Sequence, residues 1–392
     1  MQLVYDVVEA AVGAAVIKVI GIGGGGCNAI NNMVENAVGG IEFISANTDA
    51  QSLQNSKASK RIQLGNNLTR GLGAGADPEI GRNAAMEDRE SLVDAIRGAN
   101  MLFITTGMGG GTGTGAAPVV AELAKEMGIL TVAVVTRPFE YEGKRIQVAN
   151  NGIEILKNTV DSLIVIPNDK LMSALGEDVS MREAFRAADS VLRNAVAGIA
   201  EVITNPGIIN LDFADVKNVM SIMGMAMMGS GNAHGIDRAR IATEQAIASP
   251  LLDDVTLDGA QGVLVNITTA PGCLKMSEYK EIMSMIDEYA HPDAALKYGT
   301  SEDESMEEGE IRVTIIATGL QEQKILHQQQ ASNLRVVHTA QATGTDDAYP
   351  DIGSVVRSGR SARSMNLAAA DFSNQSVLDD FEIPAVIRRQ AD

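Results

Sequence analysis

Tryptophan is absent from this 392-residue sequence, and aromatic residues make up only 3% of it. Its interior must therefore be filled by Val, Ile, Leu, Met and Ala rather than by stacked rings. Cysteine is scarce as well, since Cys27 and Cys273 are too few for a disulfide framework or a cysteine zinc site. Two isolated thiols are typical of a protein in a reducing compartment.

Positive charge is also in short supply. The 31 Lys and Arg residues stand against 50 Asp and Glu residues, which gives a formal net charge of −19. Such acidity argues against non-specific binding to nucleic acid or to an anionic membrane. No apolar run reaches the roughly 18 residues that span a bilayer, and the N-terminus lacks the basic region of a signal peptide. We therefore expect a cytoplasmic protein that neither binds nucleic acid nor inserts directly into a membrane.

The sequence does contain a regular alternation of apolar runs and helical patterns. Its length and its 45% apolar content predict two domains, each able to bury a core. Continuous apolar strands separated by helices are typical of a parallel sheet covered on both faces. A Rossmann-like α/β domain is therefore expected over 16–179. Its predicted strands are 16–23, 41–48, 101–107, 129–136 and 161–168, with helices at 28–37 and 116–127.

A long helix is predicted to follow over 180–204. Ser180 and Glu183 have the spacing of a capping box, and apolar residues then recur every three or four positions. A helix of roughly 24 residues is about 36 Å long, enough to connect two domains. The second, smaller α/β domain is expected over 205–320. Its predicted helices are 215–228, 236–248 and 277–289, and its strands 262–269 and 311–319.

The two ends of the chain differ from this pattern. Residues 1–15 are expected to form a flexible acidic extension. Residues 321–376 are rich in Gln, Ser, Ala, Thr and Gly without a sustained period, which is typical of a disordered linker. Residues 377–392 regain apolar side chains around Pro384. A short apolar peptide on a long tether is typical of a segment that binds a partner.

Glycine-rich turns carry the clearest chemical signal. GGGTGTG at 109–115 lies between a predicted strand and a predicted helix, where backbone N–H groups and a helix dipole can face a phosphate chain. The G-x-x-x-x-G-K-[ST] loop with its phosphate-binding lysine is absent. Backbone groups and a metal ion must therefore neutralise the phosphates. A third glycine stretch, 71–76, is placed to close over the far end of such a chain.

An earlier turn, 21–26, leaves a second interpretation open. It fits G-x-G-x-x-G after a strand, and Asp49 follows the next strand as the ribose-binding acid of a dinucleotide unit would. An NAD-dependent oxidoreductase is therefore an alternative, although no acid or base for hydride transfer can be named. Two glycine turns at the carboxyl ends of one parallel sheet instead favour a cradle for a single polyphosphate.

Together the motifs resemble the tubulin/FtsZ family. The similarity is carried by IGIGGGGCN (20–28), NTDAQ (47–51), GLGAGADPEIG (71–81), GGGTGTG (109–115), IPNDK (166–170), NLDFADV (210–216) and the terminal DDFEIPAVIRRQAD (379–392). The resemblance implies a protein that binds GTP and GDP, hydrolyses GTP with Mg²⁺, and polymerises head to tail. It also implies a role in the cytokinetic ring at midcell.

The same resemblance implies which residues bind the nucleotide. Phe185 stacks on the base and Asp189 reads it, because a carboxylate accepts hydrogen bonds from guanine N1–H and the N2 amine whereas adenine N1 is an acceptor. From the residues alone, Phe185 is a core side chain and Asp189 a solvated acid. The other residues implied are Gly24, Gly25, Gly26, Cys27, Asn28, Gly110, Gly111, Thr112, Gly113, Glu142, Arg145 and Asn168.

The chain departs from the family pattern at two positions. Cys27 stands where the family usually has Gly or Asn, and it is expected to bring a thiol beside the nucleotide. Around Arg145 the chain is one residue shorter than the family's EGKKR or EGRKR, so the assignment of Arg145 depends on where the gap falls.

Asn210, Asp212 and Asp215 are the catalytic residues that the resemblance implies. From the residues alone, Asp212 caps a helix and Asp215 complements its dipole. In the tubulin family this loop enters the nucleotide pocket of the neighbouring subunit. There two carboxylates would orient the water that attacks the γ-phosphate. A filament protein that binds nucleotide without hydrolysing it is a third interpretation.

The resemblance also implies the partners. The chain would assemble with further copies of itself. Its terminal segment Asp379–Asp392 would dock on division proteins such as the actin-like FtsA membrane tether.

Overall fold

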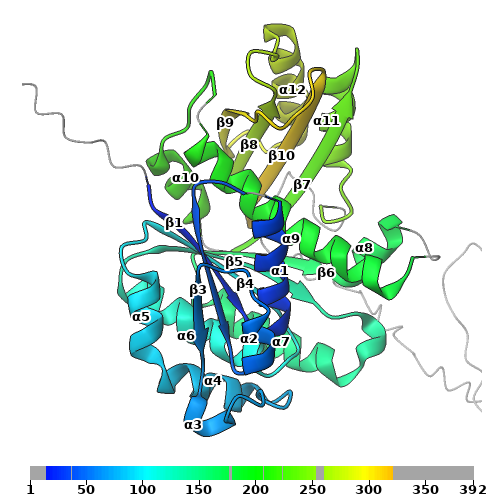
Figure 1. The fold of residues 1–392 in the computed structure, drawn as a ribbon. Coiled ribbons are helices and arrows are strands. Elements are labelled where there is room, and N and C mark those ends of the chain that lie inside the picture. The colour runs from blue at the N-terminus through cyan, green and yellow to red at the C-terminus, as the bar shows by residue number, and fades with distance from the viewer. Residues whose placement is uncertain are drawn as a thin grey trace, which may run out of the picture. The chain divides into compact units, whose positions relative to one another are not determined.

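The computed structural model describes residues 15–320, apart from 37, 176–178, 206, 223 and 253–259. Figure 1 shows how these residues are arranged. The predicted N-terminal extension up to residue 14, the predicted linker and the predicted terminal peptide lie outside the described residues. The described residues up to Leu320 belong to one compact unit.

In this part of the chain, ten strands form one sheet in the order β3-β2-β1-β4-β5-β6-β7-β10-β8-β9. All neighbouring pairs from β3 to β7 are parallel. The first six strands are β1 (Ile17–Ile22), β2 (Ile41–Asn47), β3 (Lys60–Gln63), β4 (Met101–Gly107), β5 (Leu130–Arg137) and β6 (Ser162–Pro167). The five strands predicted for this half are confirmed within one residue at each end. The short strand β3 escaped prediction because its only apolar residue is Ile62.

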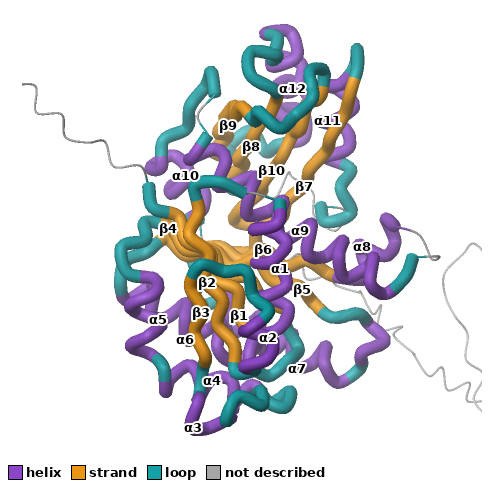
Figure 2. The backbone as a smooth tube through the Cα atoms, viewed as in Figure 1, coloured by secondary structure: helices purple, strands orange, loops and turns teal. Residues whose placement is uncertain are grey.

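Helices cover both faces of this half-sheet, because successive side chains of a strand point to opposite faces. Val19 and Phe103 pack in one core cluster with α1 and α9, whereas Ile20 and Ile104 pack in another with α4, α5, α6 and α7. Figure 2 shows the strands enclosed between these helices. The helices are α1 (Gly23–Glu35), α4 (Pro78–Glu87), α5 (Arg89–Ile96), α6 (Thr112–Glu126), α7 (Lys144–Lys157) and α9 (Met181–Thr204). Shorter ones are α2 (Ala50–Gln54), α3 (Asn66–Thr69), η1 (Glu140–Glu142) and α8 (Asn168–Leu175).

The long helix α9 is confirmed with its predicted start. The hydroxyl of Ser180 accepts a hydrogen bond from the backbone N–H of Glu183, and the Glu183 carboxylate accepts one from the backbone N–H of Ser180. This reciprocal capping satisfies two N–H groups that a helix start leaves without partners. Most of the predicted apolar stripe, including Leu192, Val196 and Ile199, is buried in the core, but Phe185 at its start is exposed and is not the core side chain expected from the residues alone. The helix contacts both β6 and β8, so it spans the two halves of the sheet.

The second half of the sheet is mixed in direction. Strand β10 (Glu310–Leu320) runs antiparallel to both β7 (Gly224–His234) and β8 (Gly262–Thr269), while β9 (Ala295–Glu302) runs parallel to β8. Its helices are α10 (Phe213–Met220), α11 (Arg238–Ile247) and α12 (Met276–Tyr289). Because β7 also pairs with β6, the two halves that the sequence separates into domains share one sheet.

One prediction in this half is wrong. The helix expected over 215–228 ends at Met220, and Gly224–His234 is strand β7. The run GMAMMGSG contains Met and Ala, which are strong helix formers, but tertiary packing overrides that propensity. A Cβ atom at Gly229 or Gly231 would come within 2.0 Å of a carbonyl oxygen of α11. The glycines therefore let α11 lie directly against the backbone of the strand.

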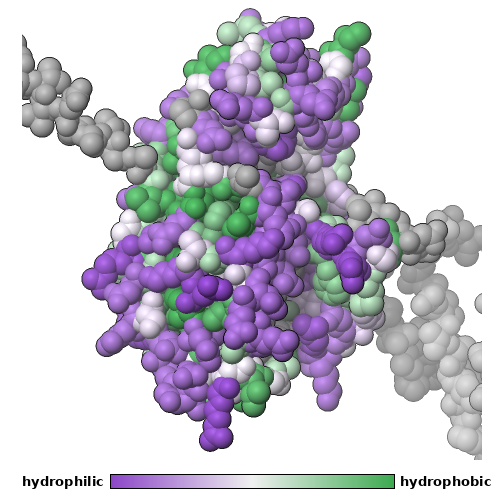
Figure 3. Space-filling view, viewed as in Figure 1, coloured by the Kyte–Doolittle hydropathy of each residue, from purple (hydrophilic) through white to green (hydrophobic). Residues whose placement is uncertain are grey.

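One face of the molecule is largely polar (Figure 3). Polar side chains cover most of the face seen in Figure 3, with apolar patches between them. Among the described residues, no helix combines the length and the apolar character needed to cross a membrane.

Candidate nucleotide site

A cavity of about 540 Å³ lies at the carboxyl ends of the parallel strands. It is walled by the segments that follow β1, β4, β5 and β6, together with one face of α9. All of the predicted binding residues except Gly26 and Cys27 line it, namely Gly24, Gly25, Asn28, Gly110, Gly111, Thr112, Gly113, Glu142, Arg145, Asn168, Phe185 and Asp189. Chain segments more than 150 positions apart thus meet at one site.

Two helices begin at this cavity. Helix α1 starts at Gly23, five residues earlier than the expected Asn28, and α6 starts at Thr112 rather than Ala116. Residues 23–26 therefore form the first turn of α1, whereas residues 109–111 form the turn that leads into α6 and Gly113 and Gly115 lie within it. Neither start is capped by a side chain. Their first N–H groups and the positive ends of both helix dipoles remain for an anion in the cavity.

The glycines of these turns perform two different tasks. A Cβ atom at Gly24 or Gly110 would meet nothing within 4 Å, because these residues face open space. At Gly113 the same atom would come within 2.1 Å of the Thr106 hydroxyl, and at Gly26 within 2.5 Å of the Thr105 carbonyl. The first pair gives a ligand access to the backbone, and the second pair lets the helices approach the sheet.

Cys27 does not bring a thiol to the cavity. Its side chain is buried on the side of α1 away from the cavity, near Ser45 and Asn47, and burial raises its pKa to about 11. A protonated, buried thiol is a poor nucleophile. Cys27 therefore contributes packing and backbone, and the thiol expected beside the nucleotide is absent from the cavity wall.

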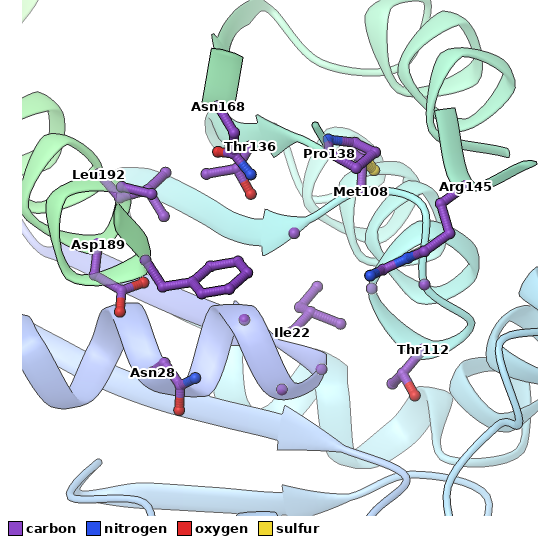
Figure 4. A pocket seen from close by; sticks show the side chains of 18 of the residues that line it. Ile22, Asn28, Met108, Thr112, Thr136, Pro138, Arg145, Asn168, Asp189 and Leu192 are labelled. Carbon is purple, nitrogen blue, oxygen red and sulfur yellow. The ribbon is translucent and has the colours of Figure 1, made fainter. Parts of the chain in front are cut away.

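The two ends of the cavity differ in chemistry. Figure 4 shows Asp189 and Asn28 at one end and Arg145 and Thr112 at the other. At the first end, Phe185 is 46% exposed and its ring meets that of Phe139 edge to face, with centroids 5.9 Å apart. A large exposed aromatic face beside hydrogen-bonding groups is suited to a planar base.

Asp189 is the acid at this base end. Burial without a partner cation raises its pKa to about 6. A carboxyl group held in this way gains from any ligand that donates hydrogen bonds to its ionised form.

The opposite end is organised around Arg145. Its guanidinium pairs with the Glu142 carboxylate and also donates through Nε to the Gly109 carbonyl at 3.4 Å. Glu142 in turn accepts the Phe139 N–H at 3.0 Å. These contacts fix the guanidinium, which is paired with the Glu142 carboxylate, beside the turn that leads into α6, where its other N–H groups can donate to a phosphate.

Several functional details were not predicted. The Thr112 hydroxyl is hydrogen-bonded to that of Thr48 at 2.6 Å, which fixes the first residue of α6. The buried Oδ1 of Asn168 has no hydrogen-bond partner in the described part of the chain, so it is available to a donor on a ligand. Met108, Thr136, Pro138 and Leu192 also line the cavity. Their only sequence signal is position. Met108 and Pro138 directly follow strands, Thr136 is the second-last residue of β5, and Leu192 lies about one helical turn after Asp189.

The remaining glycine stretch and Asp49 take structural roles. Ala74 contacts Gly111, so the 71–76 segment supports the α6 turn from behind. The Asp49 carboxylate accepts the N–H groups of Gln51 and Ser52 at 2.9 and 3.2 Å and caps α2. It does not line the cavity. Asp49, the residue that would bind the ribose in a dinucleotide enzyme, is thus a helix cap outside the cavity.

The predicted catalytic residues lie outside this cavity. We call residues 210–215 the acidic loop. Asn210 and Asp212 are exposed. Asp212 caps α10 by accepting the Asp215 N–H at 2.7 Å, and Asp215 pairs with Lys297 Nζ at 2.7 Å. In a single copy Asp212 is the predicted helix cap, and Asp215 lies in the first turn of α10 as predicted but also has an ion-pair partner that the sequence did not indicate.

The described residues contain no cluster of three His, Cys, Asp or Glu side chains that would hold a metal ion. Mg²⁺ is commonly carried by the phosphates of a nucleotide and by water, and it then needs few protein ligands. The site is thus compatible with a metal that arrives on its substrate.

Comparison with known proteins identifies relatives for both halves of the chain. The domain described as "Tubulin/FtsZ family, GTPase domain" matches residues 16–176, and "FtsZ family, C-terminal domain" matches residues 224–321. The chain is 70% identical over 391 residues to the cell division protein FtsZ of Neisseria meningitidis serogroup A, covering 100% of this chain and 99% of that one. It is 52% identical over 395 residues to the FtsZ of Pseudomonas aeruginosa, covering 99% and 100% of the two chains.

Solved structures give the same result. An FtsZ dimer of M. jannaschii superposes with a TM-score of 0.74 at 46% identity, covering 78% of this chain and 89% of that one. CetZ2 from Haloferax volcanii, solved as a GTPγS-bound protofilament, shares the fold with a TM-score of 0.67 at 21% identity, covering 78% and 94%.

Proposed function

The chain belongs to the Tubulin/FtsZ family of GTPases, and we propose that it assembles head to tail into filaments whose GTPase sites are completed between subunits. The observation that carries this proposal is that the nucleotide cavity and the acidic loop lie apart in a single subunit. The cavity has groups suited to a base and to phosphates, whereas the acidic loop lies outside it on the surface of the same subunit.

The cavity suits a guanine nucleotide. The base would stack on Phe185 and donate N1–H and its N2 amine to the Asp189 carboxylate. Adenine would place an acceptor against that buried acid, which is unfavourable. The phosphates would lie across the starts of α1 and α6, close to Arg145.

The acidic loop would supply the hydrolytic groups from a neighbouring subunit. Asp212 and Asp215 accept hydrogen bonds, so together with Asn210 they can orient a water molecule toward the γ-phosphorus. Water then forms the new P–O bond as the bond to the β-phosphate oxygen breaks, and GDP and phosphate leave. The backbone N–H groups of the cavity stabilise the charge that spreads over the phosphate oxygens.

A Mg²⁺ ion, carried by the triphosphate, would add neutralising charge. Because Asp212, Asp215 and Arg145 are placed by protein contacts, the roles proposed for them do not depend on its position.

A filament protein that binds nucleotide without hydrolysing it is a second candidate. One observation favours it, since Asp212 and Asp215 already act as cap and ion-pair partner in a single copy. The two candidates differ in whether removal of one carboxylate changes the rate of turnover.

Phosphate release from GTP, measured across a series of protein concentrations, tests the proposal. Activity that appears only above a threshold concentration supports a site completed between subunits. A rate strictly proportional to protein from the lowest concentration would overturn the shared site. Absence of release, with GTP still bound, would favour the passive filament.

The cellular context follows from the same family. We propose that the filaments form at midcell in the cytoplasm. The terminal segment Asp379–Asp392, which lies outside the described residues, would recruit a membrane tether such as FtsA. The net charge of −19 is consistent with a partner, rather than lipid or nucleic acid, as the direct contact.

A further inference from the structure

The acidic loop is attached to one strand of the sheet. Strand β9 is the last in the sheet order, so its outer edge is open to other segments. Gly207 donates to the Thr300 carbonyl at 3.0 Å, and Thr300 donates its N–H to the Ile209 carbonyl at 2.9 Å. Ile209 donates to the Thr300 hydroxyl at 2.8 Å. The chain that leads into the acidic loop is therefore paired with β9 along its edge.

Packing on one face of the same strand continues this attachment. A Cβ atom at Gly299 would lie 2.9 Å from Leu211, so the strand has a glycine where the loop passes over it. Two positions earlier, on the same face, Lys297 reaches Asp215 at 2.7 Å. The neighbour between them, Tyr298, turns to the other face and donates to Asp287 of α12 at 2.7 Å. Alternation along β9 thus directs Lys297 to the acidic loop.

The two carboxylates of the loop are held by different means. Asp212 is oriented by a backbone N–H of its own helix, which remains after any substitution elsewhere. Asp215 is oriented by a side chain that is 82 positions away in the sequence. The partners are partly shielded, with side-chain exposures of 38% for Lys297 and 30% for Asp215. Of the two acids, only Asp215 therefore has a side-chain partner that a substitution can remove.

We infer that Lys297 is a positioning residue for hydrolysis, and this inference rests on the proposed function of the acidic loop. Its ammonium fixes the Asp215 carboxylate at the surface that meets the next nucleotide. It also balances one of the two negative charges that the loop brings toward a polyphosphate. Two unbalanced carboxylates would repel that polyphosphate, since like charges at close range are unfavourable.

The test uses the full-length chain with Lys297→Met, which keeps the length of the side chain and removes the charge. We expect kcat, measured at saturating GTP and per assembled subunit, to fall about tenfold. GTP affinity at protein concentrations below assembly stays unchanged, because Lys297 does not line the cavity. Lys297→Arg keeps the positive charge and restores at least half of the lost rate. Lys280→Met, at an exposed position of α12, removes the same charge and retains the wild-type rate.

A second comparison shows whether Lys297 acts through Asp215. The double variant Lys297→Met with Asp215→Asn should be no slower than Asp215→Asn alone, because the carboxylate that Lys297 holds is already gone. A rate loss in the double variant equal to the product of the losses in the two single variants would overturn the positioning role. So would a Lys297→Met rate equal to that of Lys280→Met, or a Lys297→Arg rate as low as that of Lys297→Met.

Failure of this inference can be told from failure of the proposed function. If Asp212→Asn and Asp215→Asn both hydrolyse GTP at the wild-type rate, the acidic loop is not catalytic and the proposed function fails with it. If those variants are slow while Lys297→Met is fast, only the role of Lys297 is refuted. Thermal melting of each variant shows whether a lost rate reflects a lost fold.

Discussion

The candidate nucleotide cavity and the acidic loop differ in whether backbone or side-chain groups form them. Much of the cavity wall is backbone, since α1 begins at Gly23, residues 109–111 lead into α6, and a Cβ atom at Gly24 or Gly110 would meet nothing within 4 Å. The acidic loop is built from side chains that already have partners within the subunit. The cavity is therefore formed within one copy of the chain, whereas the role proposed for the loop requires a second copy.

This difference explains why the two regions tolerate change differently. At the glycines of the cavity the donors are backbone N–H groups, so damage at these positions comes from added volume and altered chain geometry. Arg145 and Asp189 are exceptions in the same cavity, because they act through their side chains. A loop made of side chains can lose its chemistry without losing its shape. The following predictions use that contrast, beginning with the largest expected effect.

Asp212→Asn should lower GTP turnover by about 10²- to 10³-fold while GTP binding, assembly and stability persist. Asparagine is as good an N-cap as aspartate, so α10 keeps its cap, but the charge that orients water is lost. Turnover is measured above the assembly threshold, and melting temperature is measured on the same samples.

Asp212→Ala serves as the partner variant. It loses the cap as well, and we expect it to unfold about 1 kcal/mol more easily than Asp212→Asn while hydrolysing equally slowly. Wild-type turnover in Asp212→Asn, with reduced turnover only in Asp212→Ala, would mean that the residue is a cap and nothing more.

Gly113→Ala should lower the free energy of unfolding by roughly 1–3 kcal/mol, because its Cβ atom would lie 2.1 Å from the Thr106 hydroxyl. GTP affinity should fall with it, since α6 is displaced from the sheet. Denaturant unfolding of the nucleotide-free protein measures the loss. Gly110→Ala is the matched control, because its Cβ atom meets nothing within 4 Å. Equal stability losses in the two variants would contradict the proposed division of tasks among the glycines.

The parallel half of the fold was predictable because its strands are continuously apolar and buried on both faces. The segment β7 was not, since Met and Ala favour a helix and only the contact of Gly229 and Gly231 with α11 reveals the strand. The starts of α1 and α6 were placed too late for a related reason. Glycine is a poor helix former in isolation, and here the packing of the turn against the sheet determines its conformation.

Within the site, motif positions could be assigned from the sequence but side-chain directions could not. Asn28 and Cys27 are adjacent, yet one lines the cavity and the other is buried against Ser45. Lys297 carries no motif at all, and its role emerges only because β9 lies beside the acidic loop. Contacts between distant segments are decided by topology, which a local pattern does not contain.

Asp189→Asn should weaken GTP binding by about 30-fold, since the amide can accept one guanine hydrogen bond but presents its NH₂ group to the other donor. The same change should stabilise the nucleotide-free protein at pH 7. Burial raises the pKa of Asp189 to about 6, above its ordinary value of 3.8, so ionisation opposes folding at neutral pH. The folded protein favours the protonated carboxyl of Asp189. The stability that protonation contributes is fully present below pH 3.8 and is lost as the pH rises through about 6.

Binding of GTP should show the opposite pH dependence. Guanine needs the ionised carboxylate, so affinity falls as the pH is lowered through about 6 in the wild type, and the Asp189→Asn variant lacks this step. Equilibrium binding and thermal melting between pH 5 and 8 measure both trends. A wild-type affinity that stays level over this range would exclude Asp189 as the group that reads the base.

Deletion of Asp379–Asp392 should have the smallest effect on the reaction. The described residues that line the cavity and form the acidic loop lie between 22 and 215, far from this segment in the sequence, so turnover per assembled subunit and the assembly threshold should stay within about twofold of the full-length values. Binding to a membrane tether, measured by co-sedimentation with tether-coated vesicles, should be lost. A scrambled terminal segment controls for length and charge. If the deletion instead slows turnover while the scrambled chain does not, the terminal segment takes part in assembly, and the reaction needs a third region besides the two compared above.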